Sequence, residues 1–240
     1  MLRTGKLEES RTRCAPRRRP GHPFWKIDLI ESDEGPQPAP QVFAVQMDPG
    51  SSLGTHFHFQ DQFQLVIKGG GTIGRSPLQR FSLHYASGHT GYGPLVAGEG
   101  GMTYYTIRAI TDGPGHYLPG AREEMQAVKK RNLHAEWAAP TQGGLHPLVP
   151  LQDNGAAAWA ASLAPGECFH AQGDAGMRFY VVADGSVHVA GDVLQTLDCA
   201  FLSGEHHNTP LQAGDAGAQL VVLQFNQATP SDSLPSNPPT

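Results

Sequence analysis

The sequence predicts an all-β fold that is written twice along the chain. Residues 42–108 match residues 158–224 at a fixed offset of 116 positions, without a gap. In both segments, short strand-like runs are separated by Gly, Pro, Asp and Ser, a pattern typical of β-sandwiches and β-barrels. The 29 glycines and 20 prolines among 240 residues favour the many turns that such folds need. A period this long indicates a duplicated domain rather than a solenoid of short repeats.

The positions that the two copies share are mostly turn residues, which fix the path of the backbone. The matched positions include Pro49-Gly50 with Pro165-Gly166, Phe63 with Phe179, Gly69 with Gly185, Ser87-Gly88 with Ser203-Gly204, and Pro94-Leu95 with Pro210-Leu211. Strands are expected at 42–47, 63–68, 81–85 and 102–107 in the first copy, and at 157–163, 178–182, 187–190, 198–202 and 219–225 in the second.

These patterns divide the chain into five segments. We expect a flexible basic arm at 1–23, a first β-barrel at 24–120, a helical linker at 121–140, a second β-barrel at 141–226 and a disordered tail at 227–240. The linker prediction rests on the helix-forming composition of residues 121–134, which are polar almost all round and so favour a surface connector.

Charge is distributed unevenly along the chain. Residues 1–26 carry eight basic and two acidic side chains, so the rest of the chain holds a charge of −11 within the net −5. A basic arm can contact nucleic acid, but base stacking needs aromatic side chains, and none precedes Phe24. No helix-turn-helix pattern is visible. We therefore expect a solvated terminus and no nucleic-acid partner.

Cysteine usage and hydropathy bear on location. The three cysteines, Cys14, Cys168 and Cys199, are odd in number and form no Cys-x-x-Cys pair, which favours a reducing cytoplasm. Cys168 and Cys199 fall in strand-like runs and are expected in the core. No apolar run approaches the length that spans a membrane.

The segment from His56 to Gln62 carries the most chemical information. His56 and His58 are separated by one residue in a strand-like run, so both imidazoles point to the same face. Two imidazoles on one face can bind a divalent metal ion from one side, and Gln62 follows after the next bend as a third ligand. This nitrogen-rich set is compatible with one Fe, Mn, Ni or Zn ion, without a choice among them.

These residues resemble the first motif of the cupin superfamily, and the two copies resemble a bicupin. That motif reads His-x-His, three or four residues, Glu, six residues, Gly; here it reads His56, His58, Gln62 and Gly69, with Gln where Glu is usual. The resemblance implies two tandem jelly-roll β-barrels, a metal ion, a small-molecule ligand or substrate, and a homodimer.

The resemblance also implies a further histidine after a Pro-x-Gly turn, near Gly91 or Tyr92. His84 and His89 flank this turn, and either could supply the missing nitrogen. Tyr92 could instead donate its phenol to a substrate. We expect Tyr92 and His89 to act as catalytic proton donors or acceptors. Three further residues are expected to line the substrate pocket: Phe63, His84 and Tyr85.

The second copy lacks the ligands. His56, His58 and Gln62 correspond to Gln172, Asp174 and Arg178. A guanidinium at a ligand position repels a metal ion and favours an anion. We therefore expect no metal there, and a pocket formed by Arg178 and His170, unless the second copy serves stability or dimerisation.

Two classes of function remain open at this stage. One is a metal-dependent enzyme acting on a small organic molecule, either a dioxygenase or an isomerase. The other is a non-catalytic bicupin that binds or senses a small molecule.

Overall fold

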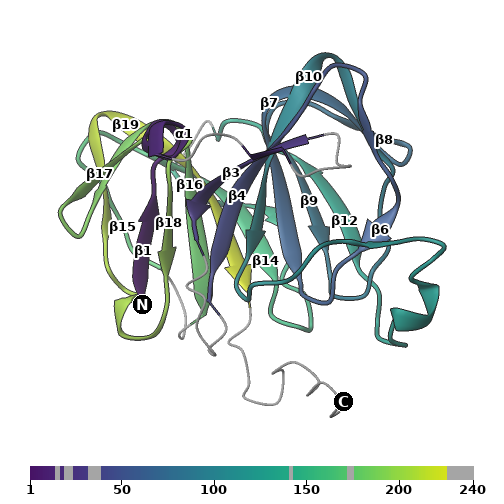
Figure 1. Ribbon diagram of the computed structural model, residues 1–240. Helices are drawn as coiled ribbons and strands as arrows, with labels where there is room; N and C mark the ends of the chain where they lie inside the picture. Colours follow the sequence, from purple (N-terminus) through teal and green to yellow (C-terminus); the bar gives the residue numbers. More distant parts are fainter. Residues whose placement is uncertain (14–16, 19–23, 32–38, 141–142, 172–175, 226–240) are drawn as a thin grey trace.

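A computed structural model describes residues 1–13, 17–18, 24–31, 39–140, 143–171 and 176–225. The expected tail, together with Cys14, Gln172 and Asp174, lies outside these residues. The expected β character is confirmed, because two large sheets account for most of the described chain (Figure 1). None of the described helices is long and apolar enough to cross a membrane.

The first sheet has nine strands, in the order β12-β9-β7-β10-β4-β3-β2, with β5 beside β10 and β8 beside β7. Its strands are β2 (Arg17–Arg18), β3 (Phe24–Ile30), β4 (Gln41–Met47), β5 (Ser52–Leu53), β7 (Gln62–Ile73), β8 (Ser76–Leu78), β9 (Ser82–Ala86), β10 (Leu95–Arg108) and β12 (Asn132–Glu136). A separate two-stranded sheet pairs β6 (His56–Phe57) with β11 (His116–Tyr117).

The second sheet has eight strands, in the order β1-β18-β16-β19-β14-β13, with β15 beside β19 and β17 beside β16. Its strands are β1 (Leu2–Gly5), β13 (Gly144–Val149), β14 (Ala157–Leu163), β15 (Cys168–Phe169), β16 (Met177–Val189), β17 (Asp192–Gln195), β18 (Cys199–Leu202) and β19 (Leu211–Phe225). The described helices are α1 (Leu7–Arg13) and two 3-10 turns, η1 (Arg122–Glu124) and η2 (Gly204–His206).

The two sheets repeat one strand order. The series β9-β7-β10-β4-β3 corresponds to β18-β16-β19-β14-β13. A repeated glycine explains part of this agreement. A Cβ on Gly69 would lie 2.1 Å from the carbonyl oxygen of Gly101, and one on Gly185 would lie 2.2 Å from that of Gly217. Both Gly69 and Gly185 also have positive φ angles, so only glycine fits at this bend of the strand.

The strand that precedes each repeat pairs with the sheet of the opposite repeat. β1 pairs with β18 of the second sheet, and β12 pairs with β9 of the first (Figure 1). After β1, the main-chain N–H of Leu7 donates to Asp198 Oδ1 at 2.9 Å, and the Leu7 side chain is buried. The prediction of a flexible arm is therefore wrong for residues 1–13, and the sheets do not follow the expected segment boundaries.

The prediction of a helical linker is also wrong. Within the described part of residues 121–140, the only helical element is the three-residue turn η1, and β12 forms instead. The physical reason is the alternation in β12: Leu133 and Ala135 pack against the core, while Asn132, His134 and Glu136 are exposed. Pairing with the edge of β9 satisfies the backbone hydrogen bonds of β12. A polar helix without an apolar stripe would gain no stability from packing against the core.

Both sheets contribute to one apolar core. The Phe63 ring lies 5.1 Å from that of Phe225, which in turn lies 5.7 Å from that of Phe179. Phe63 and Phe179 are the matched phenylalanines of the two repeats, so the repeats meet at equivalent positions. The Tyr105 hydroxyl also donates to the carbonyl oxygen of Leu197, at 2.7 Å. This shared core holds the first sheet in place beneath the site.

Candidate functional site

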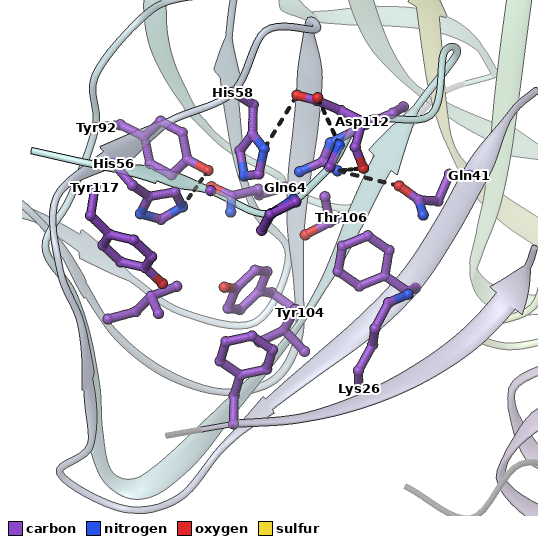
Figure 2. Close-up of a pocket in the computed structure, with 18 residues that line it drawn as sticks. Lys26, Gln41, His56, His58, Gln64, Tyr92, Tyr104, Thr106, Asp112 and Tyr117 are labelled. Carbon is purple, nitrogen blue, oxygen red and sulfur yellow. Dashed lines mark hydrogen bonds and ion pairs between the residues drawn. The ribbon is translucent and has the colours of Figure 1, made fainter. Parts of the chain in front are cut away.

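A cavity of about 90 Å³ opens on one face of the first sheet. Strand β10 lines it with Tyr104, Thr106 and Arg108, which occupy alternate positions and so point to the same face. Strand β4 contributes Gln41 and Phe43 in the same way. Figure 2 shows His56 and Tyr92 on the left of this cavity, and Gln41 on the right.

The two histidines of the His-x-His motif both line this cavity, as their spacing predicts. The centres of the His56 and His58 rings are 5.4 Å apart, and both side chains are buried. Tyr92 lies directly beside His56, because the two residues exchange main-chain hydrogen bonds of 3.1 and 3.0 Å. Tyr92 therefore occupies the region where the cupin resemblance implies a further histidine.

A directed chain of hydrogen bonds runs through these residues. Nε and Nη2 of Arg108 donate to Gln62 Oε1, at 3.1 and 2.9 Å. Gln62 Nε2 donates to the Tyr92 hydroxyl at 2.5 Å. The Tyr92 hydroxyl donates to His56 Nε2 at 2.8 Å, and His56 Nδ1 donates to the carbonyl oxygen of Gly54 at 2.7 Å. Because each donor meets an acceptor, these hydrogen bonds assign the proton of the His56 ring to Nδ1.

Burial keeps Tyr92 and His56 neutral within this hydrogen-bond chain. It raises the pKa of the Tyr92 phenol well above its usual value, so the hydroxyl keeps the proton that it donates. It also lowers the pKa of His56, and the Arg108 charge lowers it further. At neutral pH His56 is therefore uncharged, and its Nε2 lone pair is used by Tyr92.

His58 faces Asp112 on the other side of the cavity. His58 Nδ1 lies 3.3 Å from Asp112 Oδ2, but not in hydrogen-bonding geometry. Burial, followed by the Arg108 charge, lowers the pKa of His58 to about 3, so this imidazole is neutral. Burial opposes ionisation of Asp112, yet the His58 contact, the Arg108 charge and the N–H of Gly113 together lower its pKa to about 2.

The Asp112 carboxylate is directed at the backbone. Its Oδ2 accepts the main-chain N–H of Phe59 at 2.8 Å and of Gln60 at 3.3 Å, and its Oδ1 accepts that of Gly113 at 2.7 Å. The contact between Arg108 and Asp112 involves the main-chain oxygen of Asp112, at 3.5 Å, and not its carboxylate. Within the described residues, the buried guanidinium therefore has no carboxylate in direct contact.

The side chains of this site do not fit a divalent metal ion. Three candidate ligand atoms, His56 Nε2, Gln62 Oε1 and the Tyr92 oxygen, already accept hydrogen bonds. The positive guanidinium of Arg108 lies against the oxygen of Gln62, where it repels a cation. Across the part of the chain that the structure describes, no three His, Cys, Asp or Glu side chains gather as a metal would need.

Gln62 and four other expected site residues of the first repeat do not line the cavity. His84 is buried between Gln64 and Asn132, which it contacts at 2.8 and 2.9 Å. His89 Nδ1 accepts the main-chain N–H of Gln126 at 3.3 Å. The other two, Phe63 and Tyr85, belong to the shared core, where their rings lie 4.8 Å apart.

The second repeat carries the same amide–guanidinium pair with its partners exchanged. Nε and Nη2 of Arg178 donate to Gln224 Oε1 at 3.0 and 2.9 Å. At the offset of 116, Arg178 corresponds to Gln62, and Gln224 corresponds to Arg108. His170, which we expect beside Arg178, is exposed. The recurrence indicates that Gln62 is one half of a buried pair belonging to the fold.

Sequence reasoning missed the residues that define this cavity. Arg108, Thr106 and Tyr104 alternate along one strand, and this alternation is visible in the sequence. Reading positions 62 and 108 against 178 and 224 would also have revealed the exchanged pair. Asp112 follows β10 in a loop, and no local pattern marks its approach to His58.

No family model matches the chain, and no curated protein matches its sequence. Solved structures do resemble it. A bacterial pirin, YhhW from Escherichia coli in complex with nickel(II), is 13% identical with a TM-score of 0.64, over 95% of this chain and 100% of that chain.

Two other similar structures carry ligand names. Salicylate 1,2-dioxygenase from Pseudoaminobacter salicylatoxidans, in adducts with gentisate, is 14% identical with a TM-score of 0.60, over 94% of this chain and 81% of that chain. An 11S globulin from Wrightia tinctoria with an auxin binding site is 12% identical with a TM-score of 0.59, over 94% and 83%. At such identities the likeness establishes the fold alone, and this chain has a cupin-type fold.

Proposed function

We propose that this chain binds a small organic molecule in the cavity of its first repeat, as a binding or sensing protein that needs no resident metal ion. The observation that supports this most strongly is the hydrogen-bond chain from Arg108 through Gln62 and Tyr92 to His56. It uses the lone pairs that a metal would require and leaves a preformed cavity beside them.

We also propose that the two repeats are two tandem cupin-type barrels. The repeated strand order and the repeated glycine bend support this arrangement. The exchange of β1 and β12 ties the two barrels together through main-chain pairing.

The lining favours an aromatic ligand. Phe43, Tyr104 and Tyr117 present rings to the cavity, and aromatic walls bind planar molecules well. Gentisate and auxin, the ligands named for two proteins of similar fold, suggest the first compounds to test.

Metal analysis with a ligand screen tests the proposal. Protein incubated with Fe(II), Mn(II), Ni(II) or Zn(II) and then desalted is expected to retain no metal that depends on His56 and His58. The same metal-free protein is expected to show a thermal shift with aromatic ligands. One equivalent of metal that is lost in the His56→Ala/His58→Ala variant would contradict the proposal.

A metal-dependent dioxygenase is the second candidate. Two neutral imidazoles, His56 and His58, line one cavity, and this observation favours it. The nickel complex of the pirin and the dioxygenase of similar fold add support. Oxygen uptake by Fe(II)-loaded protein with gentisate or salicylate, absent from the double-alanine variant, would establish this candidate and displace the first.

A further inference from the structure

We infer that the ligand of this cavity is an aromatic carboxylate whose carboxylate group is received by Arg108. This inference rests on the proposed function and specifies its ligand class. The juxtaposition that carries it is a buried guanidinium, bonded only to neutral groups, at one end of a row of cavity-facing hydroxyls.

The guanidinium is almost fully buried, with 2% of the Arg108 surface exposed. Its hydrogen-bond acceptors are the side-chain oxygens of Gln62 and Gln41, together with the main-chain oxygen of Asp112. A buried charge is costly unless an opposite charge meets it. An anion entering the cavity would supply that partner, and its carboxylate can accept the second N–H of Nη2, which has no acceptor among the described residues.

The nearby charges leave this role open. The Asp112 carboxylate is held by three main-chain N–H groups and does not contact the guanidinium. Lys26, at the other end of the cavity, is paired with Asp28 at 2.6 Å. His56 and His58 are neutral and offer no competing cation. Arg108 is therefore the cation that an entering carboxylate would reach.

The rest of the lining fits a hydroxylated ring. Tyr104 and Thr106 are buried, and within the described residues neither hydroxyl has a hydrogen-bond partner. Along a strand, alternate side chains are about 6.8 Å apart, so Thr106 lies one such step from Arg108. A ring attached to the carboxylate would reach these hydroxyls, with the Phe43 ring beside it.

Phe43 strengthens the assignment of an aromatic ligand. The Arg108 guanidinium carbon lies 5.7 Å from the centre of the Phe43 ring, and Lys26 Nζ lies 4.5 Å from it. The ring therefore stands between the two cations and forms an apolar wall next to the anion-binding end. A ligand with one anionic end and one planar apolar body matches both features.

Matched acid and amide pairs test the inference. The probes are benzoate and salicylate with their uncharged partners, benzamide and salicylamide, titrated by NMR into the 240-residue chain. We expect each acid to bind at least ten times more tightly than its amide. The side-chain Nε–H signal of Arg108 should shift with benzoate and stay still with benzamide.

Two variants separate charge from folding. Arg108→Gln should weaken benzoate binding at least tenfold and leave benzamide unchanged, while Arg178→Gln, the corresponding change in the second repeat, should leave both unchanged. The Arg108 signal of the wild type keeps the test valid if Arg108→Gln does not fold. Equal binding of acid and amide in the cavity would overturn the carboxylate inference alone, whereas no binding of any probe there would overturn the proposed function as well.

Discussion

The substitution Gln62→Glu restores the residue that is usual in the cupin motif, and the structure predicts an unusual result for it. The new carboxylate would lie where Gln62 Oε1 accepts two bonds from Arg108, at 2.9 and 3.1 Å. We expect it to neutralise the guanidinium. It should neither recruit a metal ion nor leave Arg108 free to receive a ligand.

The magnitude follows from the bonds that change. Both bonds already have a charged donor, and a carboxylate acceptor adds the opposite charge, so the resulting buried ion pair adds about 2 kcal/mol. The variant loses the donation from Gln62 Nε2 to Tyr92, which costs about 1 kcal/mol. We expect a net gain of about 1 kcal/mol in the free energy of unfolding, or a rise of about 2–4 °C in Tm for a chain of this length.

The assay combines urea unfolding with benzoate titration. Gln62→Glu should weaken benzoate binding at least tenfold, which corresponds to about 1.4 kcal/mol. Gln224→Glu is the matched control, since Gln224 Oε1 accepts the same two bonds from Arg178 and Gln224 Nε2 donates to Gly155. It should change stability similarly and leave benzoate binding unchanged. Tight benzoate binding by Gln62→Glu, or one bound metal per chain that depends on His56, would refute the reasoning.

Three further predictions concern the scaffold. Deleting residues 1–13 removes β1 from the second sheet and the buried Leu7 of α1 from the core. We expect a loss of at least about 2 kcal/mol in the free energy of unfolding, measured in urea, and an unchanged midpoint would contradict the exchanged-strand arrangement. Gly69→Ala would place a Cβ 2.1 Å from a carbonyl oxygen, whereas Gly50→Ala, also at positive φ, would meet nothing within 4 Å; the first should lower Tm far more than the second, and equal losses would show that the close contact is unimportant. Burial, followed by the neighbouring His134, lowers the pKa of His84 to about 3. As pH falls below about 6.5, this histidine binds a proton in the unfolded chain but not in the folded one, so stability is lost from there towards pH 3. The stability difference between wild type and His84→Gln should shrink by about 2 kcal/mol from pH 6.5 to 5, and a constant difference would contradict a neutral buried His84.

Local patterns predicted most of the strands, because turn residues act locally. Gly69 and Gly185 mark the same bend in both repeats, and the strands around them fall close to the expected positions. The spacing of His56 and His58 predicted that both imidazoles point to one face, and both line the same cavity. In each case the backbone conformation of a few neighbouring residues decides the outcome.

Long-range pairing was harder to predict. The exchange of β1 and β12 depends on which sheet edge is free, and short polar segments carry little information about a distant edge. The pairing of Gln62 with Arg108 joins residues 46 positions apart. The motif alone therefore suggested a metal ligand where the folded chain places an acceptor for a guanidinium.

Anomalous diffraction from a crystal exposed to both nickel(II) and 4-bromobenzoate tests most directly whether Arg108, and not a metal ion, organises this cavity. We predict a bromine signal inside the cavity with the carboxylate on the guanidinium of Arg108, and no nickel signal between His56 and His58. A nickel ion bound by His56, His58 and Gln62, with Arg108 turned away from Gln62, would contradict this description of the site.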